Sequence, residues 1–361
     1  MTANTQPFAE STESFAETVK RTKQLNGELA PYAEPPTRAL VELTNGCNHA
    51  CIFCKNSHQS RRANFLSLDT YASFIDQALA LGLQEVGLYA TGEPFMNKQL
   101  PRYIEIAKKA GVNRVYLTSN GALATLDKVK ACHEAGLDSI KYSINASNAT
   151  DYKLVHGFDD FDVVEKNVRA TATWRQENAI DLQMLCSCVI IPSISNVEEE
   201  HRALFAPLFD DLMYVNAGSQ GGQAFELIEE LGVSPHGVFN NMDNPKSSES
   251  IKPCYMVWNR YHLTAEGYLT ACCIDYELDL VFADLNKQKL SESWNNESAL
   301  QLRTAHLDKK LDGLLCNQCL RNQRLPYKPL TSVSRTLKPD QLRDKAVSNL
   351  KERIVYTLKQ V

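Results

Sequence analysis

The sequence predicts an α/β fold, an open partial (β/α)6 TIM-like barrel followed by a small cysteine-rich domain. From Arg38 onward, short apolar runs typical of strands alternate with amphipathic stretches typical of helices. Three successive units also share one order, a glycine that ends a helix, then a strand, then a polar loop: GLQEVGLYATGEP, GVNRVYLTSNGA and GLDSIKYSINAS. Repeated strand, loop and helix units imply parallel strands joined by right-handed crossovers.

Six apolar segments are the predicted strands: Ala39–Thr44, Glu85–Tyr89, Arg114–Thr118, Ser139–Ile144, Leu182–Ile191 and Leu212–Asn216. Functional sites in such folds gather at the carboxyl ends of the strands. We therefore expect the polar motifs that follow these strands to meet at one end of the barrel.

The predicted barrel spans residues 37–232, with one segment before it and three after it. Residues 1–36 form a lead with one amphipathic helix, roughly Ser11 to Leu25, before the breaker Pro35-Pro36. Residues 233–253 are a polar linker, 254–330 the cysteine-rich domain, and 331–361 a C-terminal helix. We expect the helix to pack on the protein through an apolar stripe that recurs every four residues: Leu342, Ala346, Leu350, Ile354 and Leu358.

Composition excludes several functional classes. A chain of 361 residues is more than one core usually supports, so a large and a small domain are expected. The net charge of −5 and the absence of a basic block argue against a nucleic-acid partner. No apolar run is long enough to cross a membrane, and the polar N-terminus does not resemble a signal, so we predict a cytoplasmic protein. Eleven cysteines in that compartment indicate metal or redox chemistry rather than disulfides.

Cys47, Cys51 and Cys54 are the residues around which the functional prediction is built. Three thiols separated by three and then two residues can bind three irons of a cubane cluster. Such a cluster usually takes four cysteine ligands, so one iron would stay open. The competing interpretation is a tetrahedral zinc site, which needs a fourth ligand such as His49 or His58.

The pattern CxxxCxΦC, with Phe53 before its last cysteine, resembles the signature of the radical S-adenosylmethionine (radical SAM) superfamily. In that family SAM chelates the open iron, and one electron cleaves it to a 5′-deoxyadenosyl radical that abstracts a hydrogen atom from the substrate. The resemblance implies a SAM-binding 4Fe-4S cluster and S-adenosylmethionine as cofactors. It also implies that Phe53 lies near the adenine, although an aromatic residue there equally fits a core position.

The sequence ATGEP at 90–94, after the second predicted strand, resembles the family's GGE or GEP motif. The resemblance gives Gly92 and Glu93 the role of holding the methionine ammonium. A carboxylate suits that role because a charge-assisted hydrogen bond is about twice as strong as a neutral one. Gly-Glu-Pro is also ordinary turn chemistry. Where relatives often place an arginine for the SAM carboxylate, this chain has Lys153 and His156, so that contact is left open.

The third and fourth strands also end in motifs that resemble those of the family. Ser119 and Asn120 stand in a sequence similar to TNG, whose side chains approach the ribose or the methionine. Ser143 and Asn145 stand where many relatives have Ser-(Leu/Ile)-Asp, and the serine there contacts the SAM carboxylate or ribose. Asn145 departs from this pattern, because a neutral amide stands where the relatives have the negative charge of aspartate. Asn-Gly at the third strand end is also an ordinary turn.

A second cysteine set follows, with the spacing Cys254-x12-Gly267-x4-Cys272-Cys273 and, after a gap, Cys316-x2-Cys319. This spacing resembles the twitch form of the SPASM module, and the whole layout resembles 2-deoxy-scyllo-inosamine dehydrogenase. The resemblance implies one auxiliary 4Fe-4S cluster. A structural zinc site with the same thiolates is the alternative, and Gly267 marks the turn of a predicted hairpin. The implied ligands are Cys254, Cys272, Cys316 and Cys319.

Cys273 has three possible roles: it replaces Cys272 as a ligand, it donates a hydrogen atom as in some radical epimerases, or it is a buried bystander. We expect Cys132, Cys186 and Cys188 to be buried bystanders. The sequence does not identify a substrate base. Six residues near the expected mouth, most of which we expect to be solvated surface, are Glu226, Glu229, His236, Arg260, Tyr261 and His262.

Two reactions are compatible with these cofactors. A substrate radical beside a hydroxyl can lose a proton and an electron to give a carbonyl, or a thiol can quench it to give an epimer. We favour dehydrogenation of a sugar, cyclitol or nucleotide-linked sugar, with a flavodoxin or ferredoxin as reductant. Peptide maturation is an alternative, although the lead of about 34 residues is short for a peptide-recognition domain. A redox sensor is a second alternative, but it would not need the SAM-binding positions.

Overall fold

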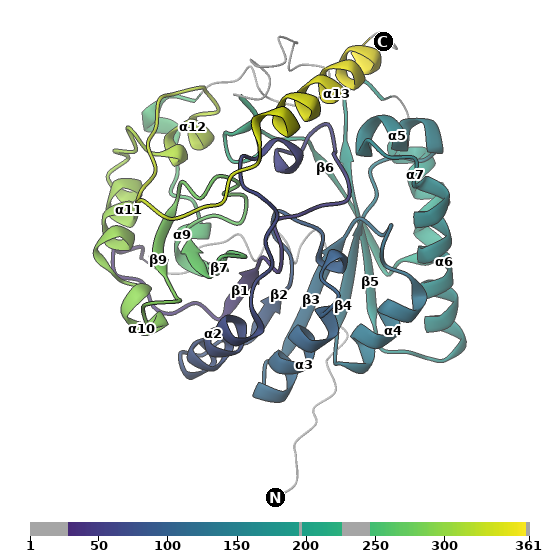
Figure 1. Cartoon of the computed structure of the whole chain (residues 1–361), viewed down its shortest axis with the longest axis horizontal. Helices are drawn as coiled ribbons and strands as arrows, with labels where there is room; N and C mark the ends of the chain where they lie inside the picture. The colour runs from purple at the N-terminus through teal and green to yellow at the C-terminus, as the bar shows by residue number, and fades with distance from the viewer. Residues whose placement is uncertain (1–27, 195–196, 226–245, 359–361) are drawn as a thin grey trace, which may run out of the picture.

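The computed structural model describes residues 28–194, 197–225 and 246–358, and it confirms the predicted α/β fold (Figure 1). The predicted helix at Ser11 to Leu25 lies outside these residues, as do Glu226, Glu229 and His236. Within the described part of the chain, nine strands form one sheet in the order β6-β5-β4-β3-β2-β1-β7-β8-β9. The strands are β1 Arg38–Val41, β2 Glu85–Gly87, β3 Arg114–Ser119, β4 Ser139–Ser143, β5 Gln183–Ile190, β6 Asp211–Asn216, β7 Tyr261–Leu263, β8 Tyr268–Thr270 and β9 Val281–Asp284.

The first six strands are those predicted, and each pairs in parallel with its neighbour in chain order. The crossovers between them are made by α2 Leu68–Ala80, α3 Leu100–Ala110, α4 Leu126–Glu134, α5 Ala149–His156, α6 Phe161–Glu177 and α7 Val197–Phe205. The remaining helices are α9 Met256–Asn259, α10 Leu290–Ser293, α11 Glu297–Leu307, α12 Leu315–Arg321 and α13 Asp340–Leu358. Short 3-10 turns lie at Asn56–His58, Pro94–Met96, Ala206–Leu208 and Ser248–Ser250.

Local signals explain where these helices start and stop. The Ser67 hydroxyl accepts a hydrogen bond from the Thr70 N–H at 3.0 Å and caps α2. Gly111 ends α3 with φ 109°, in the left-handed region that glycine adopts without strain. No helix in the described part of the chain is long and apolar enough to span a membrane.

The barrel strands present two different faces. On β3, Val115 and Leu117 are fully buried in the core beneath the helices, whereas Tyr116 between them is partly exposed. On β4, Tyr142 joins the same core, and Lys141 keeps partial exposure on the opposite face. Because strand side chains alternate, one face binds the helices and the other, which we call the inner face, is left for function.

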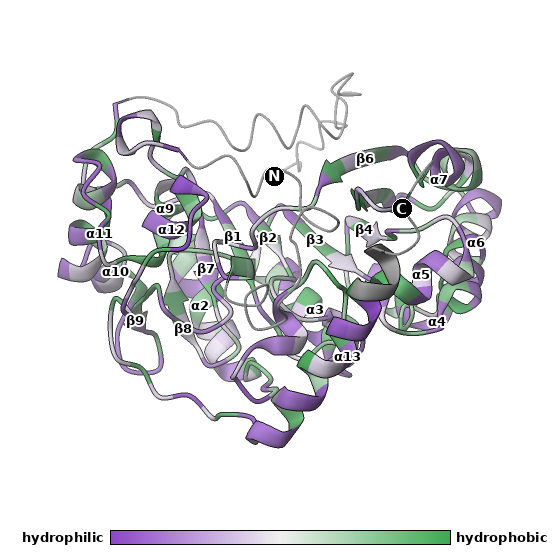
Figure 2. Ribbon diagram, turned by 90° about the horizontal axis from the view of Figure 1, so that it is seen from above, coloured by the Kyte–Doolittle hydropathy of each residue, from purple (hydrophilic) through white to green (hydrophobic). Residues whose placement is uncertain are grey.

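The cysteine-rich domain is joined to the barrel through its sheet. β7 pairs in parallel with β1, with Leu40 opposite His262, so the hairpin β7–β8 extends the barrel sheet. The predicted hairpin is confirmed, and Gly267 takes its turn at φ 85°. Figure 2 shows α9 to α12 and the helices α4 to α7 on opposite sides of the central strands.

A buried arginine fixes this junction. The Arg61 guanidinium donates to Glu42 at the end of β1 and to Glu266 in the β7–β8 turn, each at 2.7 Å, and its side chain is 1% exposed. Glu42 also accepts a hydrogen bond from the Ala265 N–H at 3.0 Å. Nearby, the Ser60 N–H donates to Glu277 at 2.8 Å. The segment after the first cysteines is therefore bound to both domains.

We expect Arg61→Met to lower the free energy of unfolding by about 3–5 kcal/mol, because it leaves two buried carboxylates without their cation. The measurement is anaerobic urea unfolding. Arg102→Met is the control, since Arg102 is 64% exposed in its pair with Glu105 and should cost under about 1 kcal/mol. Equal midpoints for the two variants would contradict this role of Arg61.

Candidate active site

The first cysteine motif lies in the loop that follows β1. Backbone hydrogen bonds hold this loop against the end of α5: the Ala50 N–H donates to the His156 carbonyl at 3.0 Å and the Ile52 N–H to the Val155 carbonyl at 2.9 Å. The Cys51 thiol interacts electrostatically with both Cys54 and Cys47. The structure thus brings the three predicted ligands together on one loop.

Each of these thiols touches a different polar group. Cys51 Sγ lies 3.5 Å from His156 Nδ1, and Cys54 Sγ lies 3.5 Å from the Tyr276 hydroxyl. Asn120 Nδ2 is 3.9 Å from Cys47 Sγ. The pKa of Cys47 is raised to about 12, mainly because the thiol is buried and secondly because the Glu93 carboxylate repels a thiolate. A bound cation is therefore needed for such a thiol to ionise. Hydrogen bonds to ligand sulfurs tune a cluster's potential.

Gly92 and Glu93 form a cradle at the end of β2. The Glu93 carboxylate accepts hydrogen bonds from the Phe95 N–H at 3.1 Å, the Ser119 hydroxyl at 2.9 Å and the Asn120 N–H at 2.8 Å. Burial still raises the pKa of Glu93 to about 7, and no ion pair offsets it within the described residues. A Cβ on Gly92 would lie 2.2 Å from the Thr44 carbonyl. A buried carboxylate without a cation fits the amino group of SAM.

The other residues predicted to contact SAM differ in their burial and in the hydrogen bonds that they already make within the protein. Ser119 and Asn120 are buried and orient Glu93, and Asn120 also donates to Asn48 Oδ1 at 2.8 Å. Ser143 is partly exposed on the inner face. Asn145 is buried and accepts from the Val189 N–H at 2.8 Å, so it serves the local structure. Contacts of these residues with SAM stay predictions.

Phe53 lies in an apolar cluster, 9% exposed, together with Ile52, Val155, Leu350 and Ile354. This packing accounts for the aromatic residue as core, and its contact with adenine stays a prediction.

Lys153 and His156 are the two residues that the sequence offers as partners of the SAM carboxylate. Lys153 is 62% exposed and pairs with Asp159 at 3.0 Å on the surface. His156 is buried, contacts Cys51, and accepts from the Asn145 N–H at 3.2 Å. Lys153 is therefore directed elsewhere, and His156 supports the cysteine loop.

The second cysteine set converges on Cys254. This thiol is an electrostatic neighbour of Cys272, Cys316 and Cys319, which come from the loop after β8 and from α12. Burial raises the pKa of Cys319 to about 12. No three of the His, Cys, Asp and Glu side chains in the described ranges are close enough to hold a single metal ion.

Cys272 and Cys273 differ in their surroundings. Cys272 packs against the main core and faces Cys254. A hydrogen bond from Cys272 lowers the pKa of Cys273, and Arg260 and Lys141 lower it further. Cys273 is also an electrostatic neighbour of Cys254, so the assignment of Cys272 as the ligand stays a prediction. Cys132, Cys186 and Cys188 are buried, as predicted for bystanders.

Tyr276 connects the two cysteine sets. Its hydroxyl contacts Cys54 at 3.5 Å, donates to Gln220 Oε1 at 2.8 Å, and interacts electrostatically with Cys272 and Cys273. The loop after β6 reinforces the junction, because Gln318 on α12 donates to the carbonyl of Gly222 at 2.8 Å. The sequence alone gave no reason to select Tyr276.

Sequence reasoning also missed what covers the first motif. α13 lies across the cysteine loop (Figure 1), where Leu350 and Ile354 are buried against Ile52 and Phe53. The Arg353 guanidinium donates to the Ala50 carbonyl at 2.6 Å. The predicted stripe pointed to this packing, but it is wrong for Leu342, which is 58% exposed because it lies in the first turn, ahead of the covered loop.

The expectation of a solvated mouth is wrong for three residues. Arg260, Tyr261 and His262 are 9%, 0% and 2% exposed, because β7 is an internal strand between β1 and β8. Tyr261 packs on the helix side against Phe74 and Trp294. Arg260 and His262 take the alternate positions and face the inner side.

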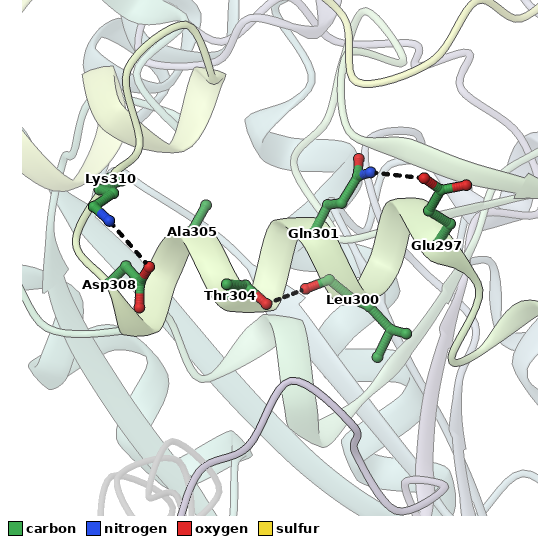
Figure 3. Close-up of a pocket in the computed structure, with 7 residues that line it drawn as sticks. All are labelled: Glu297, Leu300, Gln301, Thr304, Ala305, Asp308 and Lys310. Carbon is green, nitrogen blue, oxygen red and sulfur yellow. Dashed lines mark hydrogen bonds and ion pairs between the residues drawn. The ribbon is translucent and has the colours of Figure 1, made fainter.

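The open hollows on the outer helices are not the active site. One lies on α7, lined by Glu198, Glu199, Arg202 and Ala203. The other lies along α11, and Figure 3 shows its polar side chains bonded to one another, Gln301 to Glu297 at 3.0 Å and Lys310 to Asp308 at 3.4 Å. Neither contains a cysteine.

Two family matches cover the two cysteine sets. The family described as "Radical SAM superfamily" matches residues 41–176, and "Iron-sulfur cluster-binding domain" (SPASM) matches residues 254–320. The chain therefore contains a radical SAM domain and a SPASM iron-sulfur domain. This radical SAM enzyme therefore has SAM, a SAM-binding cluster and an auxiliary iron-sulfur cluster as its cofactors.

The chain is similar to several known proteins. A probable GTP 3′,8-cyclase of Methanococcus maripaludis (strain C7) is 24% identical over 265 residues, covering 65% of this chain and 84% of the relative. The structure of BtrN with AdoMet and 2-DOIA has a TM-score of 0.52 at 15% identity, covering 81% of this chain and 94% of BtrN. Streptococcus suis SuiB bound to precursor peptide SuiA has a TM-score of 0.58 at 12% identity, covering 85% and 74%. The two structural likenesses show the fold.

We expect Gly92→Ala to weaken SAM binding at least about tenfold, since the new methyl group would displace the loop carbonyls beside Glu93. The assay is anaerobic equilibrium dialysis on reconstituted protein. Gly218→Ala is the matched control, because a Cβ there meets nothing within 4 Å. Unchanged SAM affinity in Gly92→Ala would refute the cradle.

Anaerobic reconstitution should load about eight irons per chain. Replacing Cys47, Cys51 and Cys54 with Ala should leave about four, and so should replacing Cys254, Cys272, Cys316 and Cys319. Cys273→Ala should keep all of them, since the motif spacing gives Cys272 as the ligand. Iron loss in Cys273→Ala but not in Cys272→Ala would reverse the ligand assignment.

Proposed function

We propose that this radical SAM enzyme dehydrogenates a hydroxyl-bearing carbon of a sugar, cyclitol or nucleotide-linked sugar. The observation that supports an oxidation is the position of Tyr276, which contacts Cys54 of the first set and lies beside Cys272 and Cys273 of the second. Two cofactor sites joined by one buried side chain suit a reaction in which one site starts a radical and the other accepts an electron.

In this proposal, the two cysteine sets and the Gly92-Glu93 cradle hold the cofactors. When bound, the cofactors supply two things: from SAM, a 5′-deoxyadenosyl radical that takes a hydrogen atom from the substrate, and, in the auxiliary cluster, an acceptor for the electron that must then leave. The substrate carbon loses one hydrogen atom, and its hydroxyl loses one proton as that electron departs. The C–OH group thereby becomes C=O.

The protein's own residues orient and shield these groups. Ser119 and the Asn120 N–H hold the Glu93 carboxylate in one position for the SAM amino group. The Tyr276 hydroxyl and His156 contact two of the ligand sulfurs and can set their basicity. Leu350 and the rest of the α13 contact cover the first loop with apolar surface, which keeps water from the radical.

The comparisons bear on the substrate only by analogy. BtrN was solved with 2-DOIA, and the curated relatives are named GTP 3′,8-cyclase, a name that refers to a nucleotide. Both small-molecule cases support a sugar, cyclitol or nucleotide-linked substrate over a peptide, whereas SuiB bound to its precursor peptide keeps the peptide alternative open. A flavodoxin or ferredoxin as reductant, and a cytoplasmic location, belong to the same proposal.

Cys273 supports a second candidate function, epimerisation. Its thiol interacts electrostatically with Tyr89, Arg260 and Lys141 on the inner face. A thiol there can return a hydrogen atom to the substrate radical from the opposite side, and the sulfur radical left behind would need one electron and one proton from the reductant. Incorporation of solvent deuterium at carbon, lost in Cys273→Ala, would identify this reaction.

The test is an anaerobic assay with SAM, dithionite and a panel of polyols, nucleotide-linked sugars and peptides. We expect methionine, 5′-deoxyadenosine and a carbonyl product in equal amounts, with one deuterium moved from the labelled substrate C–H to 5′-deoxyadenosine. A quadruple Ala variant of the second cysteine set should still cleave SAM but form no carbonyl. Products only from peptides, or full carbonyl yield from that variant, would overturn the proposal.

A further inference from the structure

We infer that the inner face holds a binding site for an anionic group of the substrate, a phosphate or a carboxylate, centred on Arg260 with Lys141 beside it. This inference rests on the proposed function, in that it places the substrate on the inner face. It adds the substrate's chemical class, which neither the motifs nor the family assignment gives.

Arg260 carries the inference. Its side chain stands just before β7 and is 9% exposed, and its Nε has no hydrogen-bond partner. Within the residues that the structure describes it forms no ion pair, and its strongest electrostatic neighbours are Tyr116, Tyr89, Cys273 and Tyr255. None of these is a carboxylate. A buried guanidinium without an anion is costly, and a bound anion would offset that cost.

Lys141 brings a second cation to the same place. Its ammonium lies 5.7 Å from the centre of the Tyr89 ring, and that ring lies 6.0 Å from the Tyr116 ring. Tyr116 and Lys141 occupy the positions of β3 and β4 that alternate with core residues, so both share the inner face with Arg260. Tyr89, Tyr116 and Lys141 all keep partial exposure there, so a ligand can reach them.

The position fits a substrate anchor rather than a cofactor contact. Tyr89 comes four residues before Glu93, and Lys141 two residues before Ser143, so the group lies below the SAM end of the same strands. The Cys273 thiol faces it from the second domain. An anion held there places the rest of the molecule toward the two cysteine sets.

The chemistry selects the ligand class. A guanidinium fork pairs with the oxygens of phosphate or carboxylate, and an ammonium adds a second charge. Tyrosine rings beside them suit a sugar or a base. The chain as a whole carries a net charge of −5, so this local pair of cations does not follow from composition. A nucleotide-linked or phosphorylated sugar fits better than a neutral cyclitol.

Binding probes test this without turnover. Inorganic pyrophosphate, citrate and glucose are titrated by anaerobic calorimetry into reconstituted enzyme whose open iron is saturated with SAM. We expect pyrophosphate or citrate to bind, which distinguishes phosphate from carboxylate recognition, and glucose not to bind. Arg260→Met should weaken the anion at least about tenfold, with iron content and SAM affinity unchanged.

The matched control is Arg114→Met. Arg114 also lies over the Tyr116 ring, at 5.6 Å, but its guanidinium already donates to Gln183 Oε1 at 2.7 Å. The Arg114→Met variant should therefore leave anion binding unchanged. If Arg260→Met does not fold, Lys141→Met, at a partly exposed position, decides the question and should also weaken binding.

No affinity of the wild type for either anion, or equal loss in Arg260→Met and Arg114→Met, would overturn the inference. Because no product is measured, its failure is separate from that of the proposed oxidation.

Discussion

The parallel pairing of β1 with β7 is the constraint on which the rest of this structure depends. β1 leads into the first cysteine loop, and the hairpin after β7 leads into Cys272. A fixed register between the strands, with Leu40 opposite His262, therefore fixes the separation of the two cysteine sets. Arg61 secures the junction with two buried carboxylates, where water cannot compete for the charges.

The active site is built from buried ionisable groups that form no ion pair within the described residues. The first thiols resist ionisation because they are buried, the Glu93 carboxyl has a raised pKa, and the Arg260 guanidinium lacks an anion. Each such group costs folding free energy when it stands alone. Iron, the SAM amino group and an acidic substrate would supply the opposite charges. Unpaired buried charge is a common property of functional sites, and here it indicates what should bind at each place.

How much of the fold and of the site could be predicted depends on how far apart in the sequence the contacting residues lie. The six barrel strands and the β7–β8 hairpin were correctly predicted because alternation, glycine ends and turn residues are local properties. The meeting of the Glu93 and Ser119 motifs at one end of the barrel was expected because parallel strands end together, but the hydrogen bond between the two side chains was not. Tyr276 could not be found this way, since a lone tyrosine in a loop carries no periodic pattern, and Arg260 was named near the mouth but without its burial.

The sequence by itself determined the order of strands and helices and the kinds of ligand, because spacing and residue chemistry are written along the chain. Only the tertiary structure decided which thiols lie near one another, which charged groups surround Cys273, and what covers the first loop. The bond from Arg353 to Ala50 joins residues 303 positions apart. No local pattern specifies such a contact, because it exists only once the sheet has closed and packed.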